Sequence, residues 1–284
     1  MSTPLTAMET LFDAAGGIEM PLGGQLLKLY GRLCFALPQE RPWVIGNFVS
    51  TLDGVTALDD PTMQGGAEIS GSNAHDRMVM GLLRSVASAV IVGAGTLRAD
   101  GKHVWTPKHI FGELAPQFAA VRQALGLAVV PLNVFVTARG HIDFGMRVFQ
   151  SAEAPVLVVT TEGGAQQLRK QAVPPLVQIE AVAGVDKVVA RDVLAAVQRV
   201  APSRIILVEG GPHLMSDFFA ERAMDELFLT LAPQLGGRDG VSDRPGFVAG
   251  SLFAAAAARW SSLISVTRSQ SHLFLRYAFT PGAP

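Results

Sequence analysis

One stretch of the chain decides its fold class: residues 205–214 read IILVEGGPHL. Four consecutive branched apolar residues predict a strand that is buried on both faces, as the strands of a parallel sheet are. The two glycines and the proline that follow predict a turn into a helix that begins near residue 212. Because the unpaired N–H groups at a helix N-terminus attract anions, this turn predicts a pyrophosphate site.

The acid at the tip of this strand is a candidate functional residue. Glu209 stands between a buried strand and a glycine pair, at the edge of the sheet where ligands bind in such folds. The alternative interpretation is a solvated residue at a helix entry. We favour function, because a carboxylate in this position has no obvious role in packing.

Working outward, the same alternation of strands and helices continues. Apolar runs predict strands over residues 44–52, 89–93, 134–137 and 156–160, and helical patterns cover 76–87, 191–200 and 214–222. This order predicts an α/β fold with a mostly parallel central sheet and helices on both faces. Residues 226–232 are strand-like, and apolar runs over 263–266 and 273–279 flank a Ser-Gln-Ser turn, which predicts an antiparallel C-terminal hairpin.

The chain divides near residue 40 in this interpretation. Residues 1–40 are broken by Gly and Pro and predict an N-terminal helical extension, with helices over residues 8–15 and 25–33. Residues 41–284 contain no repeat and no long low-complexity linker. They therefore predict a single catalytic domain.

Composition excludes several classes of function. The 284 residues are 49% hydrophobic and 17% charged, with a net charge of −1 and no Lys/Arg block, which argues against a nucleic-acid partner. Cys34 is the only cysteine and the six histidines have no metal-ligand spacing, so we expect no disulfide and no metal site. No apolar run reaches about 18 residues and no signal region leads the chain, which predicts a cytoplasmic protein without a membrane contact.

Two further strand ends carry unusual residues. Residues 90–100 read VIVGAGTLRAD, where two glycines permit close approach of a ligand and Thr96 offers a hydroxyl, although a plain glycine turn is equally compatible. Residues 47–54 read NFVSTLDG, where turn chemistry alone explains Asp53 and the residues before it line the strand end. A Gly-x-Ser-x-Gly elbow, a Walker loop and a Gly-x-Gly-x-x-Gly motif are all missing, which argues against hydrolases and nucleotidases.

Taken together and in this order, the segments resemble the reductase domain of the bifunctional riboflavin-biosynthesis deaminase/reductase, a family similar to dihydrofolate reductase in fold. The matching motifs are TLDG at 51–54, EISG more loosely at 68–71, LR at 83–84, VGAGTLRAD at 92–100, VEGGP at 208–212 and DEL at 225–227. The resemblance covers about residues 41–279. Each motif alone is modest, and the ordered set is specific.

The resemblance implies an NADPH-dependent reductase, a homodimer, that converts the ribosyl group of 5-amino-6-(5-phosphoribosylamino)uracil to ribityl, with hydride transfer to the sugar C1. It implies that substrate is bound by Asn47, Arg84 and Glu209, with Glu209 in the catalytic role. It implies that the cofactor is bound by Val49, Thr96, Asp100, Thr137, Gly210, Gly211, Pro212, His213 and Leu214. We add Arg139, just past a strand end, as a clamp for the 2′-phosphate of NADPH.

The chain also departs from the family pattern. The family usually has Lys where Asn47 stands, and Asp-Pro followed by a basic residue where Asp100 is followed by Gly-Lys-His. The His-x-Glu and Pro-Cys-x-x-Cys signature of zinc deaminases is missing, which predicts a stand-alone reductase. Two alternatives stay open. One is a reductase of the same fold that acts on dihydrofolate or another pterin. The other is a catalytically silent nucleotide-binding protein, which is supported only by the N-terminal extension.

Overall fold

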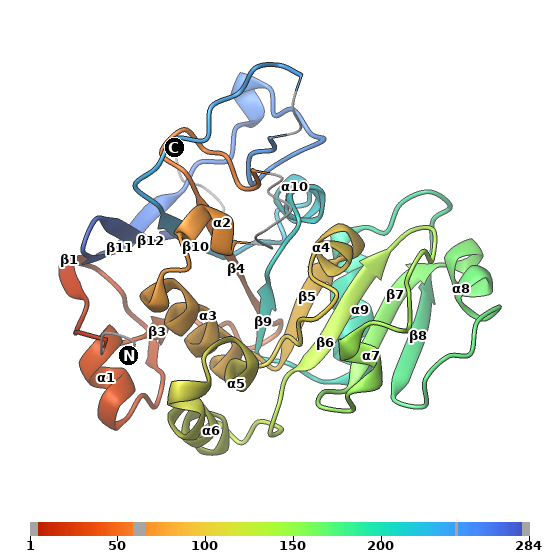
Figure 1. The fold of residues 1–284 in the computed structure, drawn as a ribbon, viewed down its shortest axis with the longest axis horizontal. Coiled ribbons are helices and arrows are strands. Elements are labelled where there is room, and N and C mark those ends of the chain that lie inside the picture. Colours follow the sequence, from red (N-terminus) through yellow and green to blue (C-terminus); the bar gives the residue numbers. More distant parts are fainter. Residues whose placement is uncertain (1–4, 59–65, 242–243, 280–284) are drawn as a thin grey trace.

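A computed structural model describes residues 5–58, 66–241 and 244–279 of the chain. Within these residues, ten strands form one sheet in the order β1-β11-β12-β10-β4-β9-β5-β6-β7-β8, and β2 pairs with β3 beside it (Figure 1). The strands are β1 (Glu9–Asp13), β2 (Ile18–Glu19), β3 (Cys34–Phe35), β4 (Trp43–Ser50), β5 (Ala89–Gly93), β6 (Leu132–Thr137), β7 (Val156–Thr161), β8 (Val177–Val182), β9 (Ile205–Val208), β10 (Glu226–Leu231), β11 (Ser262–Ser269) and β12 (His272–Ala278).

The sheet has a parallel part and an antiparallel part. Neighbouring strands from β10 through β4, β9, β5, β6 and β7 to β8 run parallel. The hairpin of β11 and β12 adds antiparallel to β10, and β1 adds antiparallel to β11. The predicted fold class, with its C-terminal hairpin, is therefore confirmed.

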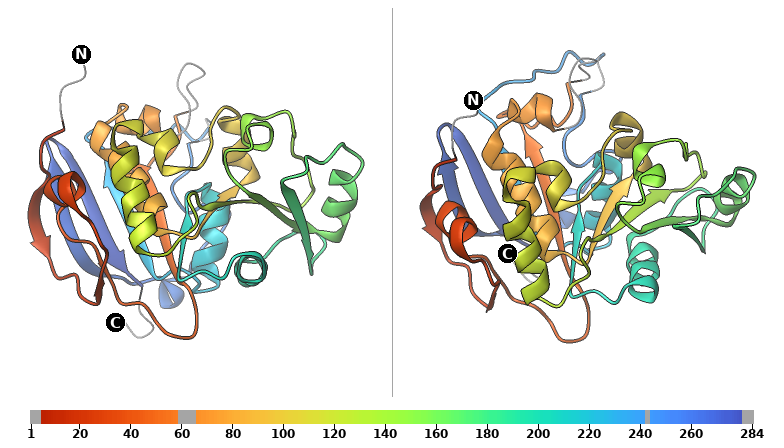
Figure 2. Two further views of the ribbon diagram at one scale, coloured as in Figure 1. Left: turned by 90° about the horizontal axis from the view of Figure 1, so that it is seen from below. Right: turned by 60° about the horizontal axis from the view of Figure 1, so that its bottom comes forward.

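Helices cover both faces of the sheet (Figure 2). They are α1 (Gly24–Tyr30), α2 (Ala67–Ser70), α3 (Ala74–Val86), α4 (Ala94–Ala99), α5 (Pro107–Ile110), α6 (Ala115–Ala124), α7 (Arg147–Gln150), α8 (Glu162–Leu168), α9 (Ala190–Val200) and α10 (Pro212–Ala220), with short 3-10 turns at Gly112–Leu114 and Ala255–Ala257. Among the residues described, no helix combines the length and the apolar character needed to cross a membrane.

The central strands bury side chains on both faces, which explains their continuous apolar sequences. In β9, Ile205 and Leu207 belong to the core under α3 and α6, whereas Ile206 and Val208 belong to the core under α9 and α10. Strands alternate side chains between the two faces, so a strand inside two helical layers needs an apolar residue at every position.

The neighbours β5 and β9 form the topological switch point of the sheet. They pair in parallel, but the helices that follow them pack on opposite faces, since Leu97 of α4 belongs to one core and Met215 of α10 to the other. Diverging connections leave a crevice outside the carboxyl ends of the two strands, where ligands bind in open α/β sheets.

The N-terminal region differs from the prediction. The helix expected over residues 8–15 is wrong, because residues 9–13 form β1 at the edge of the main sheet. The helix expected over 25–33 is observed as α1, which begins one residue earlier and ends at Tyr30. Leu26, Leu33 and Phe35 are fully buried in the core shared with α3. The domain boundary at residue 40 stays a prediction, and the segment before it packs directly against the reductase sheet.

Candidate active site

A cleft of about 1620 Å³ opens at the carboxyl ends of the central parallel strands. Its walls come from the ends of β4, β5 and β6, from the segment after β9 and from the start of α10. It brings together most of the predicted site residues: Asn47, Val49, Thr96, Thr137, Arg139, Glu209, Gly210, Gly211, Pro212, His213 and Leu214. Arg84 and Asp100 lie behind this wall, as described below. The individual roles of all these residues stay predictions.

The glycine turn after β9 approaches the α4 segment closely. A Cβ on Gly211 would lie 3.0 Å from the Thr96 hydroxyl oxygen, and one on Gly210, whose φ is +117°, would lie 3.4 Å from it. The Gly210 carbonyl accepts a hydrogen bond from the Gly93 N–H at 2.8 Å, which joins the two strand ends. Only glycine leaves room for this contact, so the turn brings unobstructed backbone to the crevice.

The start of α10 suits an anion. Gly211 is the N-cap of this helix, no side chain caps it, and no acidic residue stands in its first turn. The first N–H groups of a helix have no partner within the helix and carry a partial positive charge. Pro212 has no N–H, so the N–H groups of Gly211, His213 and Leu214 are the donors that this helix start can offer, which fits the predicted pyrophosphate site.

Arg84 and Glu209 form a buried ion pair. The Arg84 Nη2 lies 2.7 Å from Glu209 Oε2, and its Nε donates to both carboxylate oxygens at 2.9 and 3.1 Å. The two side chains are only 1% and 3% exposed. The Arg84 guanidinium thus faces the Glu209 carboxylate and not open cleft, which makes Arg84 a positioning residue for Glu209.

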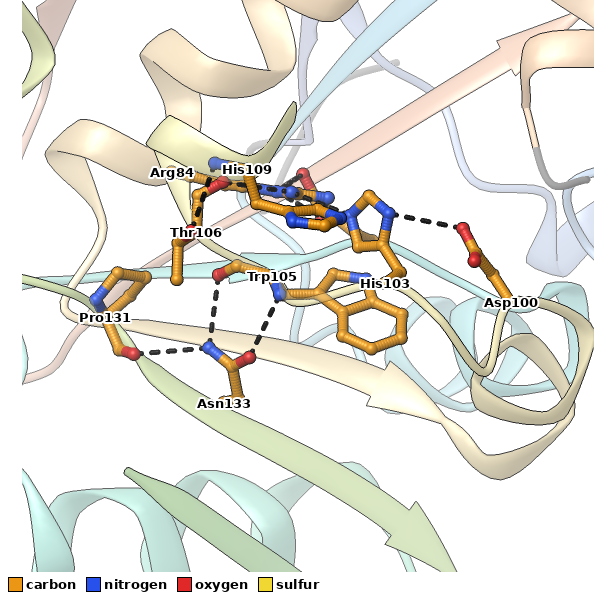
Figure 3. A network of polar contacts seen from close by, with 9 residues as sticks. Arg84, Asp100, His103, Trp105, Thr106, His109, Pro131 and Asn133 are labelled. Atoms are coloured by element: carbon orange, nitrogen blue, oxygen red, sulfur yellow. Dashed lines mark hydrogen bonds and ion pairs between the residues drawn. The ribbon is translucent and has the colours of Figure 1, made fainter. Parts of the chain in front are cut away.

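The network continues from Arg84 to Asp100 through His103 (Figure 3). Arg84 Nη1 donates to His103 Nε2 at 3.0 Å, and His103 Nδ1 lies 3.2 Å from the Asp100 carboxylate. Arginine has no acceptor, so His103 is neutral and carries its proton on Nδ1. Burial and the Arg84 charge lower the pKa of His103 to about 4, in agreement with a neutral ring. Asp100 therefore supports the site from behind in this structure.

The loop that carries His103 is fixed to the sheet. The side chain of Asn133, at the start of β6, accepts from the Trp105 N–H at 3.1 Å and donates to the Trp105 carbonyl at 3.1 Å. The Trp105 ring packs edge-on against His103 at 4.8 Å between centroids. From α6, Arg122 donates to the carbonyls of Arg84 and Ala87 at 2.9 and 2.8 Å and so caps the end of α3. Arg84 is thus held at both its backbone and its guanidinium.

The depressed pKa of His103 predicts a loss of stability in acid. The folded-state pKa of about 4 lies below the ordinary value of 6.5, so the unfolded chain binds more protons between these values. The stabilisation is complete above pH 6.5 and is lost as the pH falls toward 4, by on the order of 3 kcal/mol. We expect His103→Gln, which does not titrate, to flatten the urea-unfolding free energy over this pH window relative to the wild type. Parallel pH profiles of the two proteins would contradict the assignment.

The cleft has an acidic end and a basic end, where its cations gather. Arg98, Arg139 and Lys187 line the basic end near β6 and β8, together with Asp186 and Asp217, and Lys187 is paired with Asp217 at 2.6 Å. Among the residues described, Arg98 and Arg139 have no ion-pair partner and both are exposed. Glu209, Glu68 and Asp76 line the end near β4. The cations without an ion-pair partner among the described residues thus line the cleft near β6, away from the carboxylates near β4.

Asp76 is a functional candidate that the sequence interpretation missed. It lies in the first turn of α3, is 4% exposed and lines the cleft. Burial raises the pKa of Asp76 to about 6, against the opposing effect of the nearby Thr230 hydroxyl. The pattern Asn73-x-x-Asp76 has the appearance of a helix start, and this hides the residue in the sequence.

Asp53 has the structural role expected for it. Its carboxylate accepts from the N–H groups of Gly236 and Gly237 at 2.9 and 2.6 Å and from the Thr51 hydroxyl at 2.5 Å. These bonds, the Thr51 bond first, hold the pKa of Asp53 well below its usual range. The carboxylate thus joins the turn after β4 to the loop after β10. In the part of the chain that the structure describes, no cluster of three or more His, Cys, Asp or Glu side chains could hold a metal ion.

Comparison with known proteins agrees with this geometry. The family model of the RibD C-terminal domain matches residues 42–264. By structure, the chain is similar to a deaminase/5-amino-6-(5-phosphoribosylamino)uracil reductase of Thermotoga maritima, with a TM-score of 0.60 and 20% identity over 85% of this chain and 57% of that one. It is also similar to a pyrimidine reductase-like protein of Corynebacterium diphtheriae, with a TM-score of 0.57 and 20% identity over 85% and 93%. At these identities the structural likeness concerns the fold.

Two curated relatives are similar in sequence. The riboflavin biosynthesis protein RibD of Aquifex aeolicus is 25% identical over 203 residues, which are 71% of this chain and 49% of that protein. The 2,5-diamino-6-ribosylamino-4(3H)-pyrimidinone 5′-phosphate reductase of Archaeoglobus fulgidus is 26% identical over 200 residues, 70% of this chain and 84% of that one. The chain thus spans about half the length of the first of these relatives. With most of its length matched by the family model, the chain belongs to the RibD C-terminal domain family.

Proposed function

We propose that the protein is an NADPH-dependent reductase that converts the ribosyl group of 5-amino-6-(5-phosphoribosylamino)uracil to ribityl. One observation carries the proposal: a glycine-lined helix N-terminus and a buried, Arg-held carboxylate follow the same strand, β9, at the switch point of the sheet. The first suits a dinucleotide pyrophosphate and the second suits the N–H groups of an aminopyrimidine. The relative in Archaeoglobus fulgidus is named as a reductase of a ribosylaminopyrimidinone phosphate, and the one in Aquifex aeolicus as a riboflavin biosynthesis protein, and both names support the proposal.

The residues present fit a nicotinamide cofactor. Gly211 has no side chain, and a Cβ there would lie 3.0 Å from the Thr96 hydroxyl oxygen. Its bare backbone can therefore come close to a phosphate. Val49, at the end of β4, would offer backbone groups to the nicotinamide amide, and Thr137, at the end of β6, would lie near the adenosine half. When bound, the cofactor supplies the hydride, and the chain aligns the two rings and excludes water.

Arg139 decides the preference for NADPH in this proposal. It is exposed at the basic end of the cleft and free of an ion pair within the described residues, as a clamp for the 2′-phosphate must be. Loss of a charge-assisted bond of about 1.5–3 kcal/mol predicts that Arg139→Ala raises the Kd for NADPH roughly 10- to 100-fold and leaves that for NADH unchanged. Fluorescence titration with both cofactors measures this. If Arg98→Ala has this effect and Arg139→Ala has none, the clamp is the other arginine.

A specific observation favours a second candidate, a reductase of a pterin such as dihydrofolate. The family usually has Lys where Asn47 stands, and the Arg84 guanidinium is paired with Glu209. Within the described residues, the acidic end of the cleft therefore shows carboxylates and an amide but no unpaired cation for a substrate phosphate. A ring rich in N–H donors without a phosphate would suit these groups.

NADPH oxidation, followed by absorbance, separates the two candidates when the ribosylaminopyrimidine phosphate and dihydrofolate are tested side by side. Turnover of the first alone supports the leading proposal and makes Asn47 a tolerated variant. Turnover of the second alone supports the pterin reductase. Binding of NADPH with turnover of neither overturns both and supports the silent nucleotide-binding alternative.

Three further points belong to this proposal: a cytoplasmic location, a homodimer, and the extent of the reductase domain over residues 41–284. Exposed apolar side chains near the hairpin edge, among them Leu11, Phe12 and Leu263, are available to a dimer contact. A monomeric mass in light scattering at micromolar concentration would contradict the homodimer.

A further inference from the structure

Asp76 is a buried carboxyl group whose position capping does not explain. It stands at the third residue of α3, where an acid commonly accepts a hydrogen bond from the N-cap N–H. Here the Asn73 side chain already caps the helix by accepting from the N–H groups of His75 and Asp76 at 2.9 and 3.1 Å. The Asn73 N–H donates to the Ser70 carbonyl at 3.3 Å. The Asp76 carboxyl is therefore free of the capping role.

Asp76 lines the acidic end of the cleft, and its carboxyl group lies next to the hydroxyls of Thr230 and Ser70. Asp76 lines the cleft together with Asn47 of β4 and Glu209. None of the ion pairs among the described residues includes it. Glu209, by contrast, is held by Arg84. Two carboxyl groups at one site, one paired with an arginine and the other buried without an ion pair, are typical of a site that divides its roles between them.

From this juxtaposition we infer that Asp76 is the proton donor of the reaction, an inference that rests on the proposed function. Reduction of the ribosylamine needs one hydride and one proton. The C1′–O4′ bond of the sugar breaks, O4′ takes the proton from Asp76, and the nitrogen lone pair forms a C=N bond to C1′. Addition of a hydride to C1′, which a bound nicotinamide cofactor would supply, returns the electron pair to nitrogen and leaves a ribitylamine, and solvent reprotonates Asp76.

The groups around Asp76 are consistent with this role. Glu209, from the end of β9, and Glu68, from α2, line the same cleft, and the negative charge of Glu209 disfavours ionisation of Asp76. The hydroxyls of Thr230 and Ser70, and more weakly Arg77 next along α3, favour the ionised form of Asp76. His75 on α3 accepts or donates elsewhere, to Thr6 and Ser269, and His272 of β12 contacts Asn73 and Ser70. Burial remains the largest influence and raises the pKa of Asp76 to about 6, within working range of neutral pH.

The test compares Asp76→Asn with Asp192→Asn, using whichever of the two substrates the wild type reduces. Asp192 also occupies the third position of a helix, α9, and lies outside the cleft, so it controls for the loss of a helix-terminal charge. We expect Asp76→Asn to lower kcat about 10²- to 10⁴-fold, the usual range for a lost general acid, with the Kd for NADPH unchanged. We expect Asp192→Asn to match the wild type.

The pH profile adds a signature that a merely structural role would not produce. In the wild type, kcat should decline above the pKa of the donor, and this inflection should be absent in Asp76→Asn. Any titration of the substrate itself affects the wild type, Asp76→Asn and Asp192→Asn alike. A change in the pH profile that appears only in Asp76→Asn is therefore due to residue 76. Retention of the inflection, or of full kcat, in Asp76→Asn overturns the inference while the proposed function stands. A wild type that reduces neither substrate overturns the proposed function and the role of Asp76 with it.

Discussion

Arg84→Met is expected to lower the free energy of unfolding by about 3–5 kcal/mol, because it leaves the Glu209 carboxylate buried and unpaired. The pair is almost fully buried, with side chains 1% and 3% exposed. Urea unfolding with a two-state fit measures the loss. The matched control is Arg147→Met, which breaks an exposed pair of 2.8 Å with Glu153 and should cost less than about 1 kcal/mol. Equal losses would mean that the Arg84 pair is not desolvated.

Substitution of Glu209, the acidic partner of the pair, tests its role in turnover. Glu209→Gln keeps the shape of the side chain and should impair turnover while the affinity for NADPH stays nearly unchanged. The double variant Arg84→Met/Glu209→Gln removes both charges and should recover part of the stability that Arg84→Met loses, without recovery of turnover. Equal loss of turnover and of NADPH affinity in Glu209→Gln would place this residue at the cofactor and not at the substrate.

Gly210→Ala is expected to raise the Kd for NADPH at least 10-fold. The φ of Gly210 is +117°, where a residue with a side chain is strained by about 1–3 kcal/mol. The added Cβ would make only ordinary contacts, 3.4 Å from the Thr96 hydroxyl oxygen and 3.6 Å from the Phe48 ring, so the strain comes from the backbone conformation. Relaxation of this strain moves the backbone at the predicted pyrophosphate site, and each 1.4 kcal/mol of lost binding is a factor of ten in Kd.

Fluorescence titration of NADPH measures this change, and a thermal melt of each variant shows whether folding is also affected. The control is Gly112→Ala, because a Cβ there would meet no atom within 4 Å and the backbone has no positive φ. Gly112→Ala should bind NADPH as the wild type does. A Gly210→Ala protein with wild-type affinity would show that the turn after β9 does not bind the cofactor.

The parts of the fold that the sequence predicts well are those that depend on local pattern. The bounds of β5 and β9 match the predicted strands, because each is a continuous apolar run that ends at a glycine or an acid. The edge strand β8 is absent from the prediction, which relied on continuous apolar runs, whereas β8 alternates apolar residues with Gln178 and Glu180. Residues 9–13 were predicted as part of a helix, but they form the strand β1. Their strand conformation comes from pairing with β11, near the opposite end of the chain, and a local pattern does not contain that pairing.

The site likewise has features that the local sequence predicts and features that depend on packing. The motif after β9 is local, so the cleft position of Glu209 and the glycine turn could be predicted from the residues alone. The ion pair with Arg84 joins residues 125 positions apart, and the network to His103 depends on a loop fixed by Asn133. Such contacts follow from packing, which no window of sequence contains. Asp76 was missed for the same reason, since only the fold turns the start of α3 toward the cleft.

The position of β1 also bears on aggregation. An edge strand exposes unpaired backbone groups that can recruit another chain, and proteins limit this risk with short, irregular or charged edges. β1 has five residues, a register shift between Thr10 and Phe12, and acids at both ends, Glu9 and Asp13. A chain shortened past residue 13 would instead present β11, an eight-residue strand, as the edge. By covering the edge of β11, the strand β1 therefore limits edge-to-edge association of the sheet with another chain.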